Sequence, residues 1–195
     1  MSTPRRIAIL GTSGAGKTTL GREIARRLNT VFVEIDAIQH KAHWTKATVE
    51  ELRAGIEAQI GGRDRWVIDD TCQRELGDFV SSRLDVILWL DLPLLFKLGR
   101  LCRRSWRRVR TREVLWNGNV ETWRDVLVGK DSVLVHATLT HFCHRRTFPA
   151  RPDAQKIVRL RTPSEVERWL SSTFSAHGAP SALPDDMAAE KGGAG

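Results

Sequence analysis

A glycine-rich loop near the N-terminus constrains the fold of this chain more than any other feature. The segment Gly11–Thr18 reads GTSGAGKT and matches the pattern G-x-x-x-x-G-K-[ST] at every fixed position. The apolar run in Arg6–Leu10 predicts a buried strand before it, and apolar residues recur at helical spacing in Lys17–Leu28 after it. A strand, a glycine loop and a helix in this order predict a phosphate-binding loop (P-loop).

The chemistry of phosphate binding accounts for each fixed residue of this loop. Glycines let the backbone turn so that successive N–H groups face one phosphate, and the following helix adds its positive end. We expect Lys17 to reach the β- and γ-phosphates of a nucleoside triphosphate, and the Thr18 hydroxyl to bind Mg²⁺. The residues predicted to bind the nucleotide are Gly11, Thr12, Ser13, Gly14, Ala15, Gly16, Lys17, Thr18 and Thr19.

Length and composition favour one cytoplasmic domain. The 195 residues suit a single domain, and no apolar stretch approaches the roughly 18 residues of a membrane helix. No secretory signal is visible, and three scattered cysteines without a C-x-x-C pair indicate free thiols in a reducing compartment. Residues 1–175 are the expected domain, and residues 176–195, rich in Ala, Pro, Gly and Ser, are an expected disordered tail.

Strand-like and helix-like segments alternate along the rest of the domain. The further predicted strands are Val31–Ile35, Trp66–Ile68, Asp85–Leu90 and Lys156–Leu160. The further predicted helices cover residues 48–60, 94–109 and 131–143 and a last segment that opens at Pro163. This alternation predicts the α/β class: a three-layer P-loop fold whose five-stranded parallel sheet carries helices on both faces.

The net charge of +8 is concentrated in one segment. Lys97–Arg112 holds eight basic residues and no acid, while the remaining 23 basic residues equal the 23 acids in number. The helix here is expected to place its apolar residues on one side and its arginines on the others; the apolar residues are Leu94, Leu98, Leu101, Cys102 and Val109. The partner of this segment should be anionic, and three interpretations stay open: a lid over the transferring phosphoryl group, a solvated charged face, or a nucleic-acid surface.

Other features narrow the kind of P-loop protein. The chain lacks the N-K-x-D tetrapeptide of GTPases and is short for a motor or transporter ATPase. It resembles the adenylate-kinase-like P-loop proteins that are called "topology modulation" proteins in bacteria, over roughly residues 5–172. The resemblance rests on the P-loop, on Ile35–Ala37 followed by Trp44, on Trp66–Asp69, and on Ile87–Pro93 with the arginine-rich helix after it. It implies the fold and its layout, and identifies no phosphate acceptor.

The resemblance also implies roles for single residues. Asp69 ends the third strand, where nucleotide kinases place an acid that orders the water shell of Mg²⁺; Asp91, which also ends a strand, competes for that role. Asp36 ends the second strand, at the face where shikimate- and gluconate-kinase-like relatives bind the acceptor, within a substrate region of about residues 36–64. Thr162 and Pro163 lie where such kinases rest the adenine ring.

One departure from the family concerns the residues after the third strand. Many members carry Asp-Gly-Asn there, whereas this chain has Asp69, Asp70 and Thr71. The additional acid would either disfavour an anionic acceptor or simply be solvated.

Together these features predict an ATP-dependent phosphotransferase that acts on a nucleotide or small molecule, with ATP and Mg²⁺ as cofactors. The predicted catalytic residues are Lys17, Asp69, Asp36, Arg104 and Arg108, the two arginines lying in a lid of about residues 97–130; the predicted metal-binding residues are Thr18 and Asp69. The alternative is a nucleotide-dependent regulatory protein that binds nucleic acid or a protein partner through its arginine-rich helix.

Overall fold

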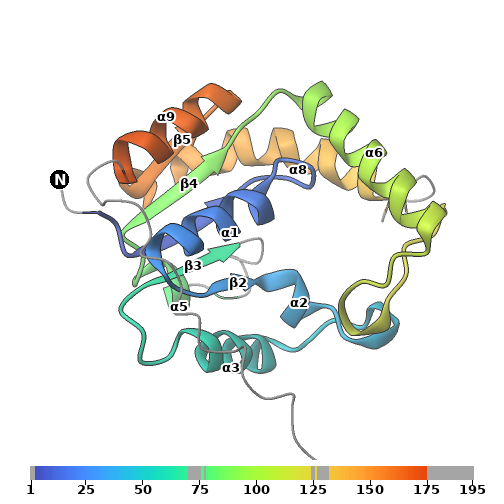
Figure 1. The fold of residues 1–195 in the computed structure, drawn as a ribbon, viewed down its shortest axis with the longest axis horizontal. Helices are drawn as coiled ribbons and strands as arrows, with labels where there is room; N and C mark the ends of the chain where they lie inside the picture. Colours follow the sequence, from blue (N-terminus) through green and yellow to red (C-terminus); the bar gives the residue numbers. More distant parts are fainter. Residues whose placement is uncertain (1–2, 70–75, 77, 124–125, 127–131, 175–195) are drawn as a thin grey trace, which may run out of the picture.

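The computed structural model describes residues 3–69, 76, 78–123, 126 and 132–174 (Figure 1). Five parallel strands form one sheet in the order β2-β3-β1-β4-β5. The strands are β1 (Arg6–Leu10), β2 (Phe32–Glu34), β3 (Trp66–Asp69), β4 (Val86–Leu90) and β5 (Ile157–Leu160). The predicted five-stranded parallel sheet is therefore confirmed.

Helices lie between successive strands of this sheet, and a last helix follows β5. They are α1 (Lys17–Leu28), α2 (Ile35–Gln39), α3 (Val49–Ile60), α5 (Asp78–Ser81), α6 (Leu94–Thr111), α8 (Val133–Thr147) and α9 (Pro163–Phe174). Short 3₁₀ turns add η1 (Ala42–Trp44), η2 (Trp116–Gly118), η3 (Phe148–Ala150) and η4 (Ala154–Lys156). Helix α3 begins where the sequence predicts, because Thr48 and Glu51 form a reciprocal capping box.

Two apolar layers, one on each face of the sheet, make up the core. Alternate residues of each strand point to opposite faces, so Ile7 and Ile9 belong to one layer and Ala8 and Leu10 to the other. Helices α1 and α9 cover the first layer, and α3 and α5 cover the second (Figure 1). This arrangement is the predicted three-layer α/β fold.

Helices α6 and α8 extend beyond the sheet (Figure 1). The predicted apolar side of α6 is partly wrong, because its buried residues are Lys97, Leu101 and Ser105, whereas Cys102 is exposed. Polar partners explain the difference: the Lys97 ammonium lies 2.7 Å from Nδ1 of His141 on α8, and the Ser105 hydroxyl donates to Glu121 at 2.6 Å. Tertiary hydrogen bonds therefore set the rotation of α6 about its axis.

Two of the differences from the predicted element boundaries concern residues near the site. Strand β2 ends at Glu34, and the chain turns directly into α2, so Asp36 lies in the first turn of a helix and not at a strand end. Helix α8 continues to Thr147, four residues beyond its predicted end. Within the described ranges no helix is long and apolar enough to cross a membrane. The predicted tail, residues 176–195, lies outside the described residues, as do Asp70 and Thr71.

Candidate nucleotide-binding and phosphotransfer site

The P-loop connects β1 to α1. It needs glycine at two positions, because the backbone there is left-handed and one of the two lies against α6. Gly14 and Gly16 have φ angles of 80° and 97°, in the left-handed region that other residues rarely adopt. A Cβ on Gly14 would lie 2.5 Å from the carbonyl oxygen of Lys97, so the loop packs directly against α6. Gly16 is the N-cap of α1, whose first amides have no partner within the helix and are available to an anion.

Lys17 and Asp69 meet beside the carboxyl ends of β1 and β3, which are neighbours in the sheet. The Lys17 ammonium lies 3.7 Å from Oδ1 of Asp69, and the two side chains are 10% and 4% exposed. Asp69 is paired with Ile9 in the sheet, and Ile9 lies just before the P-loop. The structure therefore brings together the two residues to which the sequence assigned phosphate and metal roles.

Glu34 is a residue of this site that the sequence analysis missed. It is aligned with Asp69 in the β2–β3 pair, and its Oε1 accepts a hydrogen bond from the Thr18 hydroxyl at 3.3 Å. Arg22 lies 3.5 Å from its other carboxylate oxygen. The alternation of apolar Val33 with Glu34 at the end of a predicted strand was the signal that could have indicated it.

The donor set suits Mg²⁺ and a triphosphate. Thr18, Glu34 and Asp69 offer hydroxyl and carboxylate oxygens, the ligand type that Mg²⁺ prefers. No three His, Cys, Asp or Glu side chains within the described part of the chain are grouped closely enough to hold a metal by themselves. A Mg²⁺ ion would thus be held by Thr18, by phosphate oxygens and by waters that the two acids order. Among the residues that the structure describes, the buried hydroxyl of Thr12 has no hydrogen-bond partner, as expected for a group that faces a phosphate oxygen.

Asp91, the competing acid, is engaged in a different cluster. Its carboxylate is 1% exposed and accepts hydrogen bonds from Nε of Arg145 at 3.0 Å and from Nε of Arg159 at 3.0 Å. Burial raises the pKa of Asp91, but the two arginines outweigh burial and hold that pKa below its ordinary value. The cluster joins β4, β5 and α8. It favours a structural role for Asp91, and Asp69 is the better placed metal acid.

Lys97 forms a second buried basic group behind the P-loop. Burial lowers the pKa of its ammonium to about 8, with Asp91 acting in the opposite direction. Because its carbonyl contacts Gly14 and its ammonium contacts His141, Lys97 ties the phosphate loop to α6 and α8.

The arginines of α6 divide into groups that the sequence alone does not separate. Arg100 lies on the P-loop, since a Cβ on Gly16 would be 3.4 Å from its Nη1. Arg104 is half-buried; burial and the charge of Arg108 lower its pKa, while Glu121 and Asp36 raise it. The Arg104 guanidinium thus lies close enough to Asp36 to sense its charge.

Arg108 is partly neutralised by acids of the following loop. Its Nη1 lies 3.5 Å from Glu121 and its Nε lies 3.6 Å from Glu113. Arg103 and Arg107 are exposed. Of the two predicted lid arginines, Arg104 therefore has the less compensated charge. Arg100, which the sequence analysis did not single out, lies nearest to the phosphate loop.

Two loops of similar construction meet beside Asp36. An antiparallel bridge closes residues 40–46 and another closes residues 114–120, and each loop contains a 3₁₀ turn with left-handed residues. Asn119 joins them: its Oδ1 accepts from the Trp44 amide at 3.0 Å, and its Nδ2 donates to the carbonyls of Lys41 and Trp116, each at 2.9 Å. The substrate region and the lid region are thus hydrogen-bonded to each other.

Replacing Asn119 by Ala is expected to separate these loops. The side chain is 5% exposed, so its loss leaves buried backbone groups without partners, which costs roughly 1–3 kcal/mol. We expect proteolysis within residues 40–46 and 114–120 to become about 10-fold faster, measured by limited digestion and mass spectrometry. Val114→Ala is the control, because Val114 lies in the same loop and its side chain is 68% exposed. Equal digestion of Asn119→Ala and the unmodified protein would contradict this account.

The predicted adenine-binding residues follow β5 at the carboxyl edge of the sheet. The Thr162 hydroxyl accepts a hydrogen bond from the Glu165 amide at 3.2 Å, and Pro163 is the first residue of α9. Both residues are exposed. Thr162 therefore caps the helix that was predicted to open at Pro163, and contact with adenine stays a prediction.

Comparison with known proteins agrees with this geometry. The family model for shikimate kinase matches residues 13–75. The shikimate kinase of Haemophilus influenzae (strain PittEE) is 32% identical over 69 residues, which are 35% of this chain and 29% of that protein. The shikimate kinase of Oceanobacillus iheyensis is 28% identical over 134 residues, 64% of this chain and 66% of that protein. The match to the first of these relatives thus spans less than a third of its length.

Solved structures match most of the chain. A shikimate kinase from Acinetobacter baumannii in complex with shikimate has a TM-score of 0.53 at 19% identity, covering 90% of this chain and 96% of its own. A gluconokinase from Sinorhizobium meliloti has a TM-score of 0.51 at 16% identity, with 90% and 92% coverage. A deoxyadenosine kinase from M. mycoides with bound dATP has a TM-score of 0.52 at 13% identity, with 85% and 97% coverage.

The solved structures agree with the fold of this chain, and the sequence matches agree with its P-loop. The solved structures share the α/β kinase fold, and the sequence likeness to shikimate kinases begins in the P-loop itself. The chain has the α/β fold of these kinase structures, and its N-terminal part, residues 13–75, is similar to shikimate kinases.

Proposed function

We propose that this protein is a cytoplasmic ATP-dependent phosphotransferase that acts on a nucleotide or a small hydroxylated molecule. The observation that carries the proposal is the convergence of Lys17, Thr18 and Asp69 beneath a complete P-loop. Phosphoryl transfer depends mainly on positioning and on neutralising charge, and this arrangement supplies a cation and an acid at the same point. The sequence likeness to proteins named shikimate kinase supports the same reaction class.

Each residue of the site has a distinct task in this proposal. Lys17 holds the β- and γ-phosphates, Thr18 contributes its hydroxyl to Mg²⁺, and Asp69 and Glu34 order the water around that ion. The bound ion would neutralise charge on the transferring group. Thr162 and Pro163 would rest the adenine ring of the donor.

The acceptor would bind between α2 and α6. Asp36, 33% exposed and 3.9 Å from Nε2 of His40, would accept a hydrogen bond from an acceptor hydroxyl. Arg104 would hold an anionic group of the acceptor or the transferring phosphoryl group, and Arg108 would support Arg104 from the lid side. The joined loops 40–46 and 114–120 would limit the access of water to this space.

The acceptor itself is a matter for experiment. The relatives carry the names shikimate kinase, gluconokinase and deoxyadenosine kinase, so shikimate, gluconate and deoxyadenosine are the first compounds to test. We propose that the resemblance to topology modulation proteins concerns the fold and the order of its elements and does not identify the acceptor. It adds nucleosides and nucleotides to the compounds to test.

A second candidate function has one observation in its favour. Arg103, Arg107 and Arg110 form an exposed basic face on α6, and the Arg110 guanidinium lies 5.0 Å from the ring centre of Trp106. Arginine beside an exposed aromatic ring is a common arrangement in surfaces that bind single-stranded nucleic acid. This candidate is a nucleotide-dependent regulatory protein that binds nucleic acid through α6.

Single alanine substitutions of arginines separate the two functions. In a phosphotransferase, Arg104→Ala should lower turnover roughly 10- to 1000-fold, as the loss of one charge-stabilising donor typically does, and Arg100→Ala should act similarly. The exposed Arg103→Ala and Arg107→Ala are matched controls and should change turnover less than about threefold. The measurement is ADP release with the acceptor panel, beside anisotropy titrations on single-stranded and duplex DNA at two salt concentrations.

The DNA titrations decide the alternative. A nucleic-acid surface would lose affinity in similar steps for Arg103, Arg107 and Arg110, and its affinity would fall steeply with salt. That result, together with turnover that is insensitive to Arg104→Ala, would favour the regulatory function over the kinase.

A further inference from the structure

Lys97, near the start of α6, is a buried cation beside the P-loop. It is 2% exposed, and its ammonium lies 2.7 Å from Nδ1 of His141 on α8. Among the residues that the structure describes, no acid forms an ion pair with this ammonium. Burying an ammonium without a carboxylate partner is unfavourable, because the charge loses its hydration. The location of this charge therefore calls for a counter-charge.

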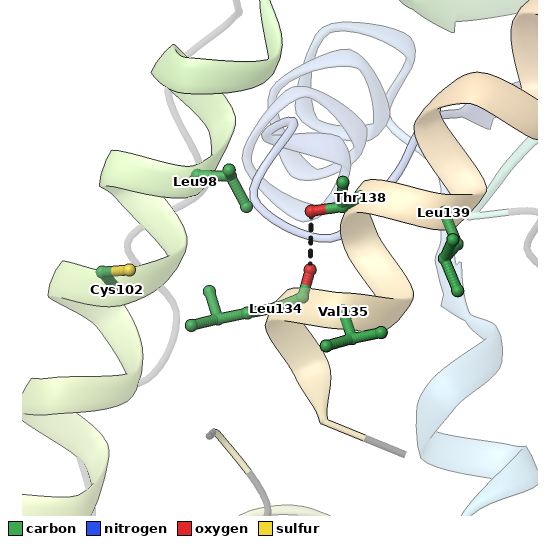
Figure 2. Close-up of a pocket in the computed structure, with 6 residues that line it drawn as sticks. All are labelled: Leu98, Cys102, Leu134, Val135, Thr138 and Leu139. Atoms are coloured by element: carbon green, nitrogen blue, oxygen red, sulfur yellow. Dashed lines mark hydrogen bonds between the residues drawn. The ribbon is translucent and has the colours of Figure 1, made fainter. Parts of the chain in front are cut away.

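The surroundings of Lys97 supply little negative charge. Neither α6 nor α8 contains an acid. Asp91 attracts the Lys97 charge, but its carboxylate already accepts hydrogen bonds from Arg145 and Arg159. The groove between the two helices holds only apolar side chains, a thiol and a hydroxyl (Figure 2), from Leu98, Cys102, Leu134, Val135, Thr138 and Leu139. Lys97 thus shares the charge of one carboxylate with two arginines.

Lys97 is also placed against the loop that is expected to bind phosphate. A Cβ on Gly14 would lie 2.5 Å from the Lys97 carbonyl oxygen, so this part of α6 packs directly on the P-loop. The Lys97 ammonium lies close enough to Lys17 for the two charges to repel each other. Since Lys17 is expected to reach the β- and γ-phosphates, a charge that repels Lys17 attracts those phosphates. A bound triphosphate is therefore the anion that suits this position.

The pKa of Lys97 agrees with a charge that lacks a full counter-charge. Burial lowers this pKa to about 8; Asp91 opposes burial, while Arg145 and Lys17 reinforce it. The groups that face Lys97 are Lys17 on α1, Asp91 after β4, and His141, His144 and Arg145 on α8. Burial lowers the pKa of both histidines, that of His144 to about 4, so both are neutral above pH 7, where Asp91 is ionised. Phosphates close to Lys97 would favour its charged form and raise its pKa.

We propose that Lys97 is a positioning residue of the nucleotide site, whose buried ammonium stabilises the bound triphosphate from behind the P-loop. It acts through the loop and through Lys17, and not as a group that touches the reacting atoms. This inference rests on the nucleotide-binding part of the proposed function, and the identity of the acceptor does not enter it. Because the ammonium form binds ATP more tightly, the protein takes up a proton on Lys97 when ATP binds near pH 8.

Isothermal titration calorimetry with ATP and Mg²⁺ tests this consequence on the unmodified protein. Titrations at pH 8 in two buffers of different ionisation enthalpy give the number of protons taken up per ATP. If the bound phosphates raise the pKa of Lys97 by about one unit, roughly 0.4 protons should be taken up, and the dissociation constant should rise about fivefold from pH 7 to pH 9. The phosphates of ATP are ionised throughout this range, since the last pKa of a phosphate monoester is about 6, and do not contribute.

Lys97→Met separates the charge of Lys97 from its place in the packing. Met keeps the length of the side chain, and the carbonyl that contacts Gly14 is unchanged. For the same change in pKa, the variant should bind ATP about 10-fold more weakly than the unmodified protein at pH 7, only about twofold more weakly at pH 9, and without proton uptake. Lys156→Met is the matched control, because Lys156 precedes β5 at the end of the sheet away from the P-loop, and it should keep the unmodified profile. Circular dichroism checks that both variants are folded.

The proton count of the unmodified protein decides the proposal even if Lys97→Met does not fold. ATP binding without proton uptake at pH 8 would overturn the proposal and leave the phosphotransferase function standing. An equal loss of affinity at pH 7 and pH 9 in Lys97→Met would also overturn it, since a purely structural role gives that result. Proton uptake without any phosphorylated acceptor would support the role of Lys97 and count against the kinase. A protein that binds no ATP would overturn both.

Discussion

Replacing Lys17 by Met is expected to lower phosphotransfer at least about 100-fold and to weaken the binding of ATP–Mg²⁺. Met keeps the length of the side chain and removes the ammonium that lies 3.7 Å from Asp69 and is placed to reach the phosphates. Removing a preorganised cation from a largely buried site costs about this much in turnover. Titration with a fluorescent ATP analogue and ADP release in the presence of an acceptor measure the two effects.

The stability of the Lys17→Met variant needs its own control. Asp69 is 3% exposed, so its carboxylate loses a nearby compensating charge and the free energy of unfolding should fall. The double variant Lys17→Met/Asp69→Asn removes both charges and should recover part of that stability while turnover stays low. Equal nucleotide affinity in Lys17→Met and the unmodified protein would contradict the assignment of the P-loop.

Asp69→Asn is expected to lower turnover about 100- to 1000-fold while nucleotide affinity changes less than about 10-fold. The carboxylate orders the water around Mg²⁺, and the position of the metal matters most in the transition state, so the loss should appear in kcat. The amide keeps the shape of the side chain, which limits changes in packing. Steady-state kinetics with varied ATP and Mg²⁺ measure both quantities.

Asp91→Asn is the matched control for this choice of acid. It should lower the free energy of unfolding by roughly 1–3 kcal/mol, since it removes a buried charged acceptor of Arg145 and Arg159, whose own side chains are 44% and 34% exposed. Turnover of the folded fraction should change little. The pKa of Asp91 is depressed in the folded state, so the stability from this cluster is present above the unfolded pKa of about 3.8 and is lost as pH falls through the folded value. A loss of turnover in Asp91→Asn, with none in Asp69→Asn, would show that Asp91 and not Asp69 orders the water around Mg²⁺.

Local patterns were sufficient to predict the sheet and the phosphate loop. The P-loop, the strand before it and helix α1 lie next to one another in sequence, and their spacing encodes their geometry. Asp69 was predictable for a similar reason, because a polar residue at the end of an apolar strand lies at the ligand edge of a parallel sheet. Thr48 and Thr162 were predictable as helix caps from neighbouring residues alone.

The parts of the site that depend on tertiary packing were not predictable in this way. Arg100 contacts the P-loop only because Lys97 and Ser105 turn α6 to a particular angle, and their partners lie 44 and 16 residues further along the chain. A prediction that buries only the apolar side of a helix cannot identify a buried lysine that bonds to a histidine. The prediction for Cys102 failed for the same reason.

Glu34 and Asn119 show two other limits. Glu34 was overlooked because the predicted strand was one residue too long and drew attention to Asp36, which lies in α2. Asn119 lies in a short polar segment, yet its side chain bonds to a loop more than 70 residues away. Long-range hydrogen bonds of this kind leave no local pattern in a single sequence.

Acceptor-dependent ADP release tests the central claim most directly. The protein is incubated with ATP–Mg²⁺ and, one at a time, shikimate, gluconate, deoxyadenosine and a set of nucleosides and nucleotides, beside Lys17→Met as the inactive control. The account predicts that at least one hydroxylated acceptor raises ADP release above the acceptor-free rate, that phosphorus NMR detects its phosphorylated product, and that Lys17→Met abolishes both. ADP release that no acceptor raises, or that Lys17→Met leaves unchanged, would contradict the account.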